Sequence, residues 1–345
     1  MQKRKVIEDK TITDKETKKG LEIIMEHKLI VSLSPHIHTK ESVSDIMLDV
    51  IIALIPAACM GVYCYGMRAA IVMLTAIAAS LLSEYLYEKL MKKPVTTGDL
   101  SAMVTGMLLG MNLPVSIPLW MVVIGSAFAI IIVKQLYGGL GKNYLNPALA
   151  ARCFMLVAWA GAMTVFSEPF AGSGADAVSA ATPLAVMKGT TSGTLPTYFK
   201  AFMGLIPGSI GETSALMLLI GGAYLLIRKV ISWRIPVTYI AAFAVLTFLF
   251  GKNTTELSQA GYTLMQLLCG GLMLGAFFMA TDYTTTPITP KGQLIFGIGC
   301  GVLTFVIRQF GGYPEGVSFS ILLMNILTPL IDKYTAPKKF GAQKA

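Results

Sequence analysis

Charged residues are scarce in this sequence. They make up 14% of its 345 residues, against 54% hydrophobic residues, whereas a soluble domain carries about 25% charged residues. A chain with so few charges cannot cover its own surface with polar groups, which excludes a water-soluble globular protein. The mean hydropathy of +0.65 agrees with a protein that lies in a lipid bilayer.

Motifs of hydrolytic, phosphate-binding and metal chemistry are absent as well. The sequence contains no nucleophile–base pair, no phosphate loop and no metalloprotease motif, and none of its five cysteines forms a CxxC pair. All five lie in apolar segments, which is typical of buried free thiols. His36 and His38 could bind a metal together, but without further ligands a solvated tail is the better interpretation. We therefore predict no metal site.

Signals of targeting and of nucleic-acid binding are also missing. A cleavable signal peptide is not expected, because the first 43 residues are charged and lack an early apolar run. The net charge of +9 comes from 28 lysines and arginines against 19 acidic residues. These cations cluster at the termini and in a few loops, so they are interpreted as signals of membrane topology and not as a nucleic-acid surface.

Ten apolar segments approach the length of about 20 residues that a helix needs to cross a bilayer. They lie at roughly 46–65, 68–88, 99–112, 118–137, 146–163, 213–231, 236–250, 262–280, 292–310 and 316–332. The third and seventh are short. The third begins at Asp99, a typical N-cap residue, and ends at Pro114, so we expect a half-helix that stops inside the protein beside a protected cavity.

Lysine and arginine residues divide unevenly between the two sides of these spans. With the N-terminus in the cytoplasm, 22 of them fall inside and five outside, while Arg152 lies within the fifth span. Because cytoplasmic loops are enriched in these residues, both termini are predicted to be cytoplasmic. The segment 164–212 is then extracytoplasmic.

The two halves of the chain share short patterns. Val104–Pro114 and Leu268–Asp282 have similar glycine spacing, and Lys134–Asn143 resembles Arg308–Gly316. Five spans per half is an odd number, so the second half must be inverted, as in many secondary transporters with broken helices. We predict an all-α polytopic membrane protein with an N-terminal tail (1–43), a first five-helix repeat (44–163), the extracytoplasmic loop (164–212), a second five-helix repeat (213–333) and a C-terminal tail (334–345).

Several polar residues occur near the ends of the predicted spans: Asn143, Asn146, Arg152, Asp282, Arg308, Glu315 and Asn325. Because such groups are costly near lipid, they are expected to face the interior, where they cap helices, bond neighbouring helices or line polar cavities. On the inner side, Asp282 with Thr284 and its neighbouring threonines is a candidate for coupling to an ion. On the outer side the candidates are Arg308 and Glu315. Glu84, alone late in the second span, is expected to extend to the membrane interface.

The stretch Asp176–Ala185 places a threonine, Thr182, in the predicted extracytoplasmic loop. From Asp176 through Ser179 to Thr182 it reads Asp-x-x-Ser-Ala-Ala-Thr, which resembles the flavinylation motif Asp-x-x-Ser-Gly-Ala-Thr. Ala180 stands where glycine is usual, but a small residue is kept. In that motif the threonine hydroxyl carries FMN through a phosphoester. An ordinary Ser/Thr-Pro turn is the alternative interpretation of these residues.

Long blocks of sequence extend the resemblance to a whole family. They are Gly138–Arg152, Phe277–Gln293, Ile307–Asp332 and the flavinylation stretch. Together and in this order they resemble the D subunit of the Rnf complex and, more distantly, the B subunit of the sodium-pumping NADH:quinone reductase. The resemblance covers roughly residues 30–335.

This resemblance implies a function. The Rnf complex moves electrons between reduced ferredoxin and NAD, coupled to Na⁺ or H⁺ export across a prokaryotic plasma (inner) membrane, and the family has a ten-helix inverted-repeat fold similar to urea and ammonium channels. For this chain it implies FMN on Thr182, attached by a flavin transferase, and the other Rnf subunits as partners. A second, non-covalent flavin such as riboflavin is compatible with the family. A solute channel or secondary transporter of the same fold, or the quinone-reductase subunit, are the alternatives.

Overall fold

The computed structural model describes residues 42–170, 179–212 and 214–337. These residues are mostly helical, with one antiparallel pair of two-residue strands. The α-helices are α2 (Val43–Tyr65), α3 (Met67–Leu90), α4 (Ser101–Met111), α5 (Leu119–Ala127), α6 (Pro147–Ala158), α7 (Ala160–Met163), α8 (Pro183–Met187), α9 (Tyr198–Met203), α10 (Ala215–Ile227), α11 (Arg234–Phe250), α12 (Gln259–Leu268), α13 (Leu272–Leu274), α14 (Pro290–Phe310) and α15 (Val317–Thr335). The other elements are the 3₁₀-helix η1 (Thr97–Asp99), the π-helices η2 (Phe128–Gln135) and η3 (Gly275–Met279), and the strands β1 (Phe166–Ser167) and β2 (Ser179–Ala180).

Long apolar helices identify a multi-pass membrane protein. Helices α2, α3 and α14 are each long and apolar enough to cross a bilayer, and α12 with Leu272–Met279 qualifies as a fourth, broken span bent by 62°. Shorter apolar helices occur at Ser101–Met111, Leu119–Gln135, Pro147–Ala158, Ala215–Ile227 and Arg234–Phe250. The predicted all-α membrane protein is therefore confirmed, while length and composition support three or four full spans in the described residues.

Each of the ten apolar segments predicted from the sequence contains helix, but two of them are interrupted. The fifth breaks at Trp159, between α6 and α7. The eighth breaks between α12 and α13, where Gly270 has a φ of +76°, a left-handed conformation that glycine adopts readily. The segment predicted as a loop, 164–212, contains β1, β2, α8 and α9.

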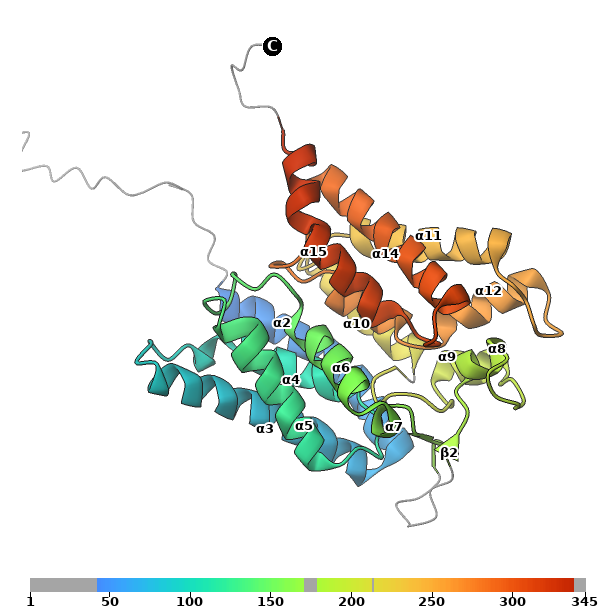
Figure 1. Ribbon diagram of the computed structural model, residues 1–345, viewed down its shortest axis with the longest axis horizontal. Helices are drawn as coiled ribbons and strands as arrows, with labels where there is room; N and C mark the ends of the chain where they lie inside the picture. The colour runs from blue at the N-terminus through green and yellow to red at the C-terminus, as the bar shows by residue number, and fades with distance from the viewer. Residues whose placement is uncertain (1–41, 171–178, 213, 338–345) are drawn as a thin grey trace, which may run out of the picture. The chain divides into compact units, whose positions relative to one another are not determined.

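The helices form two groups, which Figure 1 shows in blue to green for α2–α7 and in yellow to red for α10–α15. In the first helix group, α3 packs against α4 and α5, and α4 packs against α6. In the second helix group, α11 packs against α12 and α14, and η3 packs against α15. The order of contacts is therefore similar in both groups. The groups meet where α2 packs against α10 and α6 against α15.

Glycines bring α3 and α4 into close contact. A Cβ atom on Gly106 would lie 2.7 Å from the carbonyl oxygen of Ala76, and one on Gly110 would lie 3.0 Å from the Cα of Met73. Small residues permit this approach in membranes, where van der Waals packing is a main source of helix association. The glycine spacing noted in the sequence thus serves packing in the first helix group.

The position of Glu84 corrects a prediction. Its side chain is fully buried instead of extending to the interface, and its Oε1 accepts from Lys134 Nζ at 2.6 Å. Lys134 is also buried and donates to Ser101 Oγ at 2.6 Å. Opposite charges offset part of each other's desolvation cost, whereas either one alone would be expensive to bury. Lys134 therefore does not report on membrane topology, although it is one of the 22 cations assigned to the inside.

Another ion pair, between Asp49 and Arg228, connects the first helix group to the second. Asp49 of α2 accepts from Tyr224 Oη at 2.9 Å and from Arg228 Nη2 at 3.0 Å, at the end of α10. The Arg228 side chain is 57% exposed, and exposed pairs contribute only about 0–1 kcal/mol. This contact orients the two helices more than it stabilises them.

The cysteine prediction holds for four of the five residues. All five are free thiols, and Cys64, Cys153, Cys269 and Cys300 are buried, whereas Cys59 is exposed. Cys59 belongs to a stripe on α2, spaced by three to four residues, that faces away from the other helices: Ile52, Ile55, Cys59 and Tyr63.

Candidate functional site

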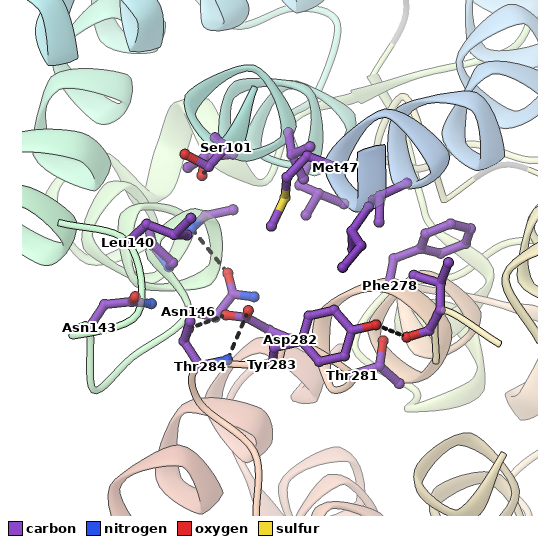
Figure 2. Close-up of a pocket in the computed structure, with 18 of the residues that line it drawn as sticks. Met47, Ser101, Leu140, Asn143, Asn146, Phe278, Thr281, Asp282, Tyr283 and Thr284 are labelled. Carbon is purple, nitrogen blue, oxygen red and sulfur yellow. Dashed lines mark hydrogen bonds between the residues drawn. The ribbon is translucent and has the colours of Figure 1, made fainter. Parts of the chain in front are cut away.

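A cavity of about 740 Å³, including the part open to solvent, lies between α2, α4 and the segments 140–148 and 278–284. Figure 2 shows Asn146, Asp282 and Thr284 gathered on one wall, with Ser101 and Met47 across from them. We call this space the inner cavity. Its lining combines apolar walls with a few placed polar groups, as sites for small molecules and cofactors do.

Asp282 is held in a hydroxyl-rich turn on the wall of the inner cavity. Its carboxylate accepts from Thr284 N at 3.3 Å, from Thr284 Oγ1 at 3.1 Å and from Thr285 Oγ1 at 3.3 Å. Thr286 Oγ1 donates to the Asp282 carbonyl oxygen at 2.8 Å. Short side chains of this kind commonly bond the nearby backbone in turns. The threonines therefore fix the carboxylate, which stays half-buried beside the cavity.

Asn146 joins the two helix groups at the same cavity. Its Oδ1 accepts from Ala148 N at 3.1 Å and from Leu149 N at 3.3 Å, so it caps α6, and Pro147 follows at the first helical position. Its Nδ2 donates to Met279 O at 3.3 Å, at the end of η3. Asn143 and Asn325 are buried as well, as predicted from the sequence.

The Glu84–Lys134 pair borders the inner cavity, because Lys134 and Ser101 both line it. Gln135 Nε2 extends the network, donating to Glu84 Oε1 at 2.9 Å and to Glu88 Oε1 at 3.2 Å. Sequence reasoning did not foresee this cluster. Its signal is present, however, because Glu84 and Lys134 are lone charges of opposite sign in otherwise apolar stretches.

Thr182 does not line the inner cavity; it lies between β2 and α8. It is half-buried and is the N-cap of α8, where its Oγ1 accepts from Ala185 N at 3.3 Å. Pro183 begins the helix, so the threonine–proline turn that was the alternative interpretation of this stretch is present as a helix cap. Thr182 lines a small pocket of about 290 Å³, the Thr182 pocket, together with Leu184, Glu212, Gly270 and other residues.

Arg152 forms a charge cluster beside the Thr182 pocket. Its Nη1 donates to Ser318 Oγ at 2.8 Å, and its Nη2 donates to the Glu315 carboxylate. Its Nη1 also lies 3.2 Å from Glu212 Oε1. Since Glu212 and Glu315 both line the Thr182 pocket, two carboxylates and one guanidinium stand next to the threonine.

A third space, which we call the aromatic cavity, lies on the other side of this cluster. It measures about 490 Å³, including open solvent, and is lined by Arg152, Glu315, Phe166, Tyr313 and Phe319, among others. The rings of Tyr313 and Phe319 stack with centroids 5.9 Å apart. Glu315 lines both this cavity and the Thr182 pocket, so the two spaces adjoin.

Arg308 and Glu315 are neighbours, as expected, but not as an ion pair. Arg308 Nε donates at 2.9 Å to the backbone carbonyl of Glu315, whose carboxylate instead binds Arg152. Arg308 Nη1 and Nη2 donate to the carbonyl oxygens of Gln266, at 2.6 Å, and Cys269, at 3.4 Å. The break after α12 frees carbonyl groups there, and a planar guanidinium with several donors is well suited to occupy them.

Glu212 is the functional candidate that sequence reasoning missed. It lies between α9 and α10 and is 3% exposed. Burial, followed by the nearby Glu315 carboxylate, raises the pKa of Glu212 above its ordinary value, while Arg152 opposes the rise. The only sequence signal is a lone acidic residue three positions before an apolar run that begins at Ala215.

Three residues singled out in the sequence, Asp176, His36 and His38, lie outside the described residues. Ser179 is described only as part of β2, which pairs with β1 next to Thr182. Among residues 42–170, 179–212 and 214–337, no group of three or more histidine, cysteine, aspartate or glutamate side chains is arranged to hold a metal ion.

Comparisons with known proteins match this sequence to a family. The family model described as NQR2, RnfD, RnfE matches residues 30–341. The D subunit of the Na(+)-translocating ferredoxin:NAD(+) oxidoreductase complex of Acetobacterium woodii is 48% identical over 322 residues, which cover 92% of this chain and 97% of the relative. The D subunit of the proton-translocating ferredoxin:NAD(+) oxidoreductase complex of Clostridium ljungdahlii is also 48% identical, over 91% of this chain and 96% of the relative.

More distant relatives agree. The D subunit of the ion-translocating oxidoreductase complex of Escherichia coli is 37% identical over 352 residues, covering 91% of this chain and 99% of the relative. Both the family match and these identities extend over nearly the whole chain, including the inner cavity and the Thr182 pocket. The chain therefore belongs to the NQR2, RnfD, RnfE family.

Proposed function

We propose that this chain is the flavin-carrying membrane subunit of an Rnf-type complex, which couples electron transfer between reduced ferredoxin and NAD to Na⁺ or H⁺ translocation. The names of the similar subunits, which include both a Na(+)-translocating and a proton-translocating complex, support the electron-transfer and ion-coupling parts. The observation that carries the flavin part is the half-buried hydroxyl of Thr182, which lies at the edge of a pocket in the flavinylation-like stretch.

The residues around Thr182 fit a covalently attached FMN. The threonine supplies the hydroxyl that a phosphoester requires, and a flavin transferase would read it together with Asp176 and Ser179. The adjoining aromatic cavity offers stacked rings and the Arg152 guanidinium, which suit a planar, polar-edged isoalloxazine ring. Bound there, FMN would supply one-electron transfer, and the chain would hold the ring and balance its charge.

The inner cavity suits a second, non-covalent flavin. Its walls combine the apolar Phe278 with the polar Asn146, Asp282 and Thr284. Amide, carboxylate and hydroxyl groups can bond the polar edge of a flavin while the apolar walls cover its ring. On the inner side, Asp282 and Thr284 would contact the ligand and couple its redox state to the ion. Near Thr182, Arg308 and Glu315 would have the same role.

The membrane arrangement is also part of this proposal. We infer ten membrane helices in two inverted repeats, with both termini in the cytoplasm and Thr182 on the outer side of the prokaryotic plasma membrane. The similar order of helix contacts in the two groups supports the repeat. Broken helices, such as α12 with η3, are common at the binding sites of inverted-repeat transporters.

Flavin analysis of the purified chain tests the proposed cofactors. After co-expression with a competent flavin transferase, mass spectrometry of the peptide that contains Thr182 should show an added FMN. Denaturation should release a further flavin, identified as riboflavin by chromatography, from the inner cavity. An unmodified Thr182 peptide would remove the flavin part of the proposal and would favour a channel of the same fold.

Cysteine labelling tests the proposed topology. Ser192→Cys lies on an exposed part of the Thr182 segment, and Ala336→Cys lies on the exposed end after α15. On intact cells an impermeant thiol reagent should label the first variant and not the second, while lysed cells should label both. Both variants need the background Cys59→Ser, because Cys59 is exposed. If only Ala336→Cys were labelled in intact cells, the orientation in the membrane would be the opposite of the one proposed.

A further inference from the structure

The charge cluster next to Thr182 leaves one carboxylate poorly compensated. Arg152 directs its hydrogen bonds to Ser318 and to the Glu315 carboxylate. It is 3.2 Å from Glu212, but Glu212 Oε1 accepts no hydrogen bond from the described residues. One guanidinium therefore lies between two carboxylates, and its interaction with Glu212 is weaker than its hydrogen bond to Glu315.

Arg308, the next nearest cation, does not donate a hydrogen bond to Glu212 either. Arg308 lies close enough to Glu212 to influence it, but its hydrogen bonds go to Gln266 and to the backbone carbonyls of Cys269 and Glu315. The titratable and charged groups that face Glu212 are Arg152 from α6, Glu315 from the segment before α15, Arg308 from α14 and Tyr65 from α2. None of these supplies a second dedicated donor to Glu212.

The polar groups in the turn of Glu212 are also incompletely bonded. Ser209 Oγ is fully buried and lies near the Glu212 carboxylate, but it is not aligned with it for a hydrogen bond of normal geometry. Glu212 Oε1 packs against the helix break, since a Cβ on Gly271 would lie 2.5 Å from it. A buried oxygen that lacks a donor has a free position at which a proton can bind.

Thr182 shares its pocket with this carboxylate. A phosphoester on Thr182 would add a negative charge to the pocket that already holds Glu212 and Glu315. An electron on the attached flavin would add another nearby. Negative charge close to a carboxylate favours its protonated form, and Glu315, whose side chain is 21% exposed, connects the cluster to solvent.

We propose that Glu212 is a proton-binding site coupled to the redox state of the flavin on Thr182. This inference rests on the proposed function. When a reduced one-electron carrier of the complex passes an electron to the flavin, a proton from water binds the Glu212 carboxylate and forms its O–H bond. When the electron leaves for the next carrier, that bond breaks and the proton returns to water. Arg152 holds the carboxylate in the oxidised state.

Redox titration of the purified complex tests this coupling. The midpoint potential of the Thr182-bound FMN should fall by about 59 mV for each tenfold drop in proton concentration, as one proton per electron requires, over a pH range around neutrality. Glu212→Gln should remove this slope. In Glu315→Gln, Glu212 is the only carboxylate beside Arg152, so it binds a proton less readily. The pH range over which the midpoint potential varies should therefore move to lower pH. Glu256→Gln, at an exposed loop residue, should match the wild type.

Two results would overturn the proposal: a potential that does not vary with pH in the wild type, or a slope that persists in Glu212→Gln with FMN still attached. If Glu212→Gln does not assemble, infrared difference spectra of the wild type decide. Reduction should produce a protonated-carboxyl band that moves in Glu212→Asp, and its absence contradicts the proposal. Mass spectrometry of the Thr182 peptide is done first, so a missing FMN is recognised as failure of the proposed function and not of this inference.

Discussion

Replacing Thr182 with valine is expected to reduce ferredoxin-to-NAD electron transfer by the assembled complex to the level of a complex without the subunit. Valine nearly matches the shape of threonine but has no hydroxyl to carry a phosphoester. The variant chain should therefore contain no covalent flavin, and ion uptake into membrane vesicles should stop with the electron flow. Flavin fluorescence of the denatured chain and NAD reduction by the vesicles measure both effects.

Two further variants separate the flavin from the helix cap. Valine also removes the N-cap of α8, which costs about 0.5–2 kcal/mol. Asparagine caps helices well but cannot carry FMN, so Thr182→Asn should fold like the wild type and still lack activity. Thr190→Val, at an exposed residue in the turn after α8, should remain active. Activity in Thr182→Asn would show that electrons bypass this residue.

The same vesicles distinguish electron transfer from ion coupling. Asp282→Asn and Glu315→Gln should keep FMN on Thr182 and much of the electron flow, because neither residue is in the flavinylation stretch. If these carboxylates take part in coupling, ion uptake per electron should fall. A wild-type ratio in both variants would show that neither Asp282 nor Glu315 takes part in ion coupling.

Replacing Lys134 with methionine is expected to destabilise the folded chain by about 3–5 kcal/mol, the usual cost of leaving a buried charge without its partner. Glu84 would then lie fully buried with only Gln135 as a donor. Thermal unfolding in detergent, followed by the fraction of chain that elutes as a single species, measures the loss. Lys142→Met, at an exposed residue after η2, should change little.

The double variant Glu84→Gln/Lys134→Met provides the decisive comparison. Neutralising both partners removes the unpaired charge, and apolar replacement of a buried pair is often neutral or stabilising. Recovery of most of the lost stability would show that Lys134 acts by charge compensation. Equal instability of the single and double variants would instead indicate that the lysine stem packs in a way that methionine cannot reproduce.

The helices could be predicted from the sequence because apolar runs and breakers carry that information locally. Helix occurs in each of the ten apolar runs, and the start of α6 at Pro147 follows from the Asn-Pro pair, whereas α8 and α9 lie in the stretch predicted as a loop. The break at Trp159 could not be foreseen, because no proline or glycine marks it. Backbone ends there are set by packing between α6 and its neighbours, which one segment of sequence does not reveal.

The candidate site was predictable in its parts but not in its pairings. Asp282 with its threonines is a local motif, and the structure keeps it local. The partners of Arg152 and Glu84 are distant in sequence, so the Arg152–Glu315 pair was not foreseen and the expected interfacial Glu84 was wrong. Charge pairing in a membrane interior depends on which helices meet, and a single sequence gives no direct record of those contacts.

The two ion pairs between the helix groups differ in stiffness. Arg152 and Glu315 are joined next to Thr182 and largely shielded from water, whereas Asp49 and Arg228 meet at the opposite ends of α2 and α10 with the arginine mostly exposed. A pair in which both side chains are shielded resists separation. Arg228 can turn to water more easily, because its side chain is mostly exposed and Tyr224 still donates to the buried Asp49 carboxylate. Any rocking of one group against the other should then pivot like a hinge at the Thr182 end and widen the inner cavity. The distribution of distances between spin labels on the two helix groups should be wider near Asp49 than near Arg152. Equal widths would exclude a hinge at the Thr182 end.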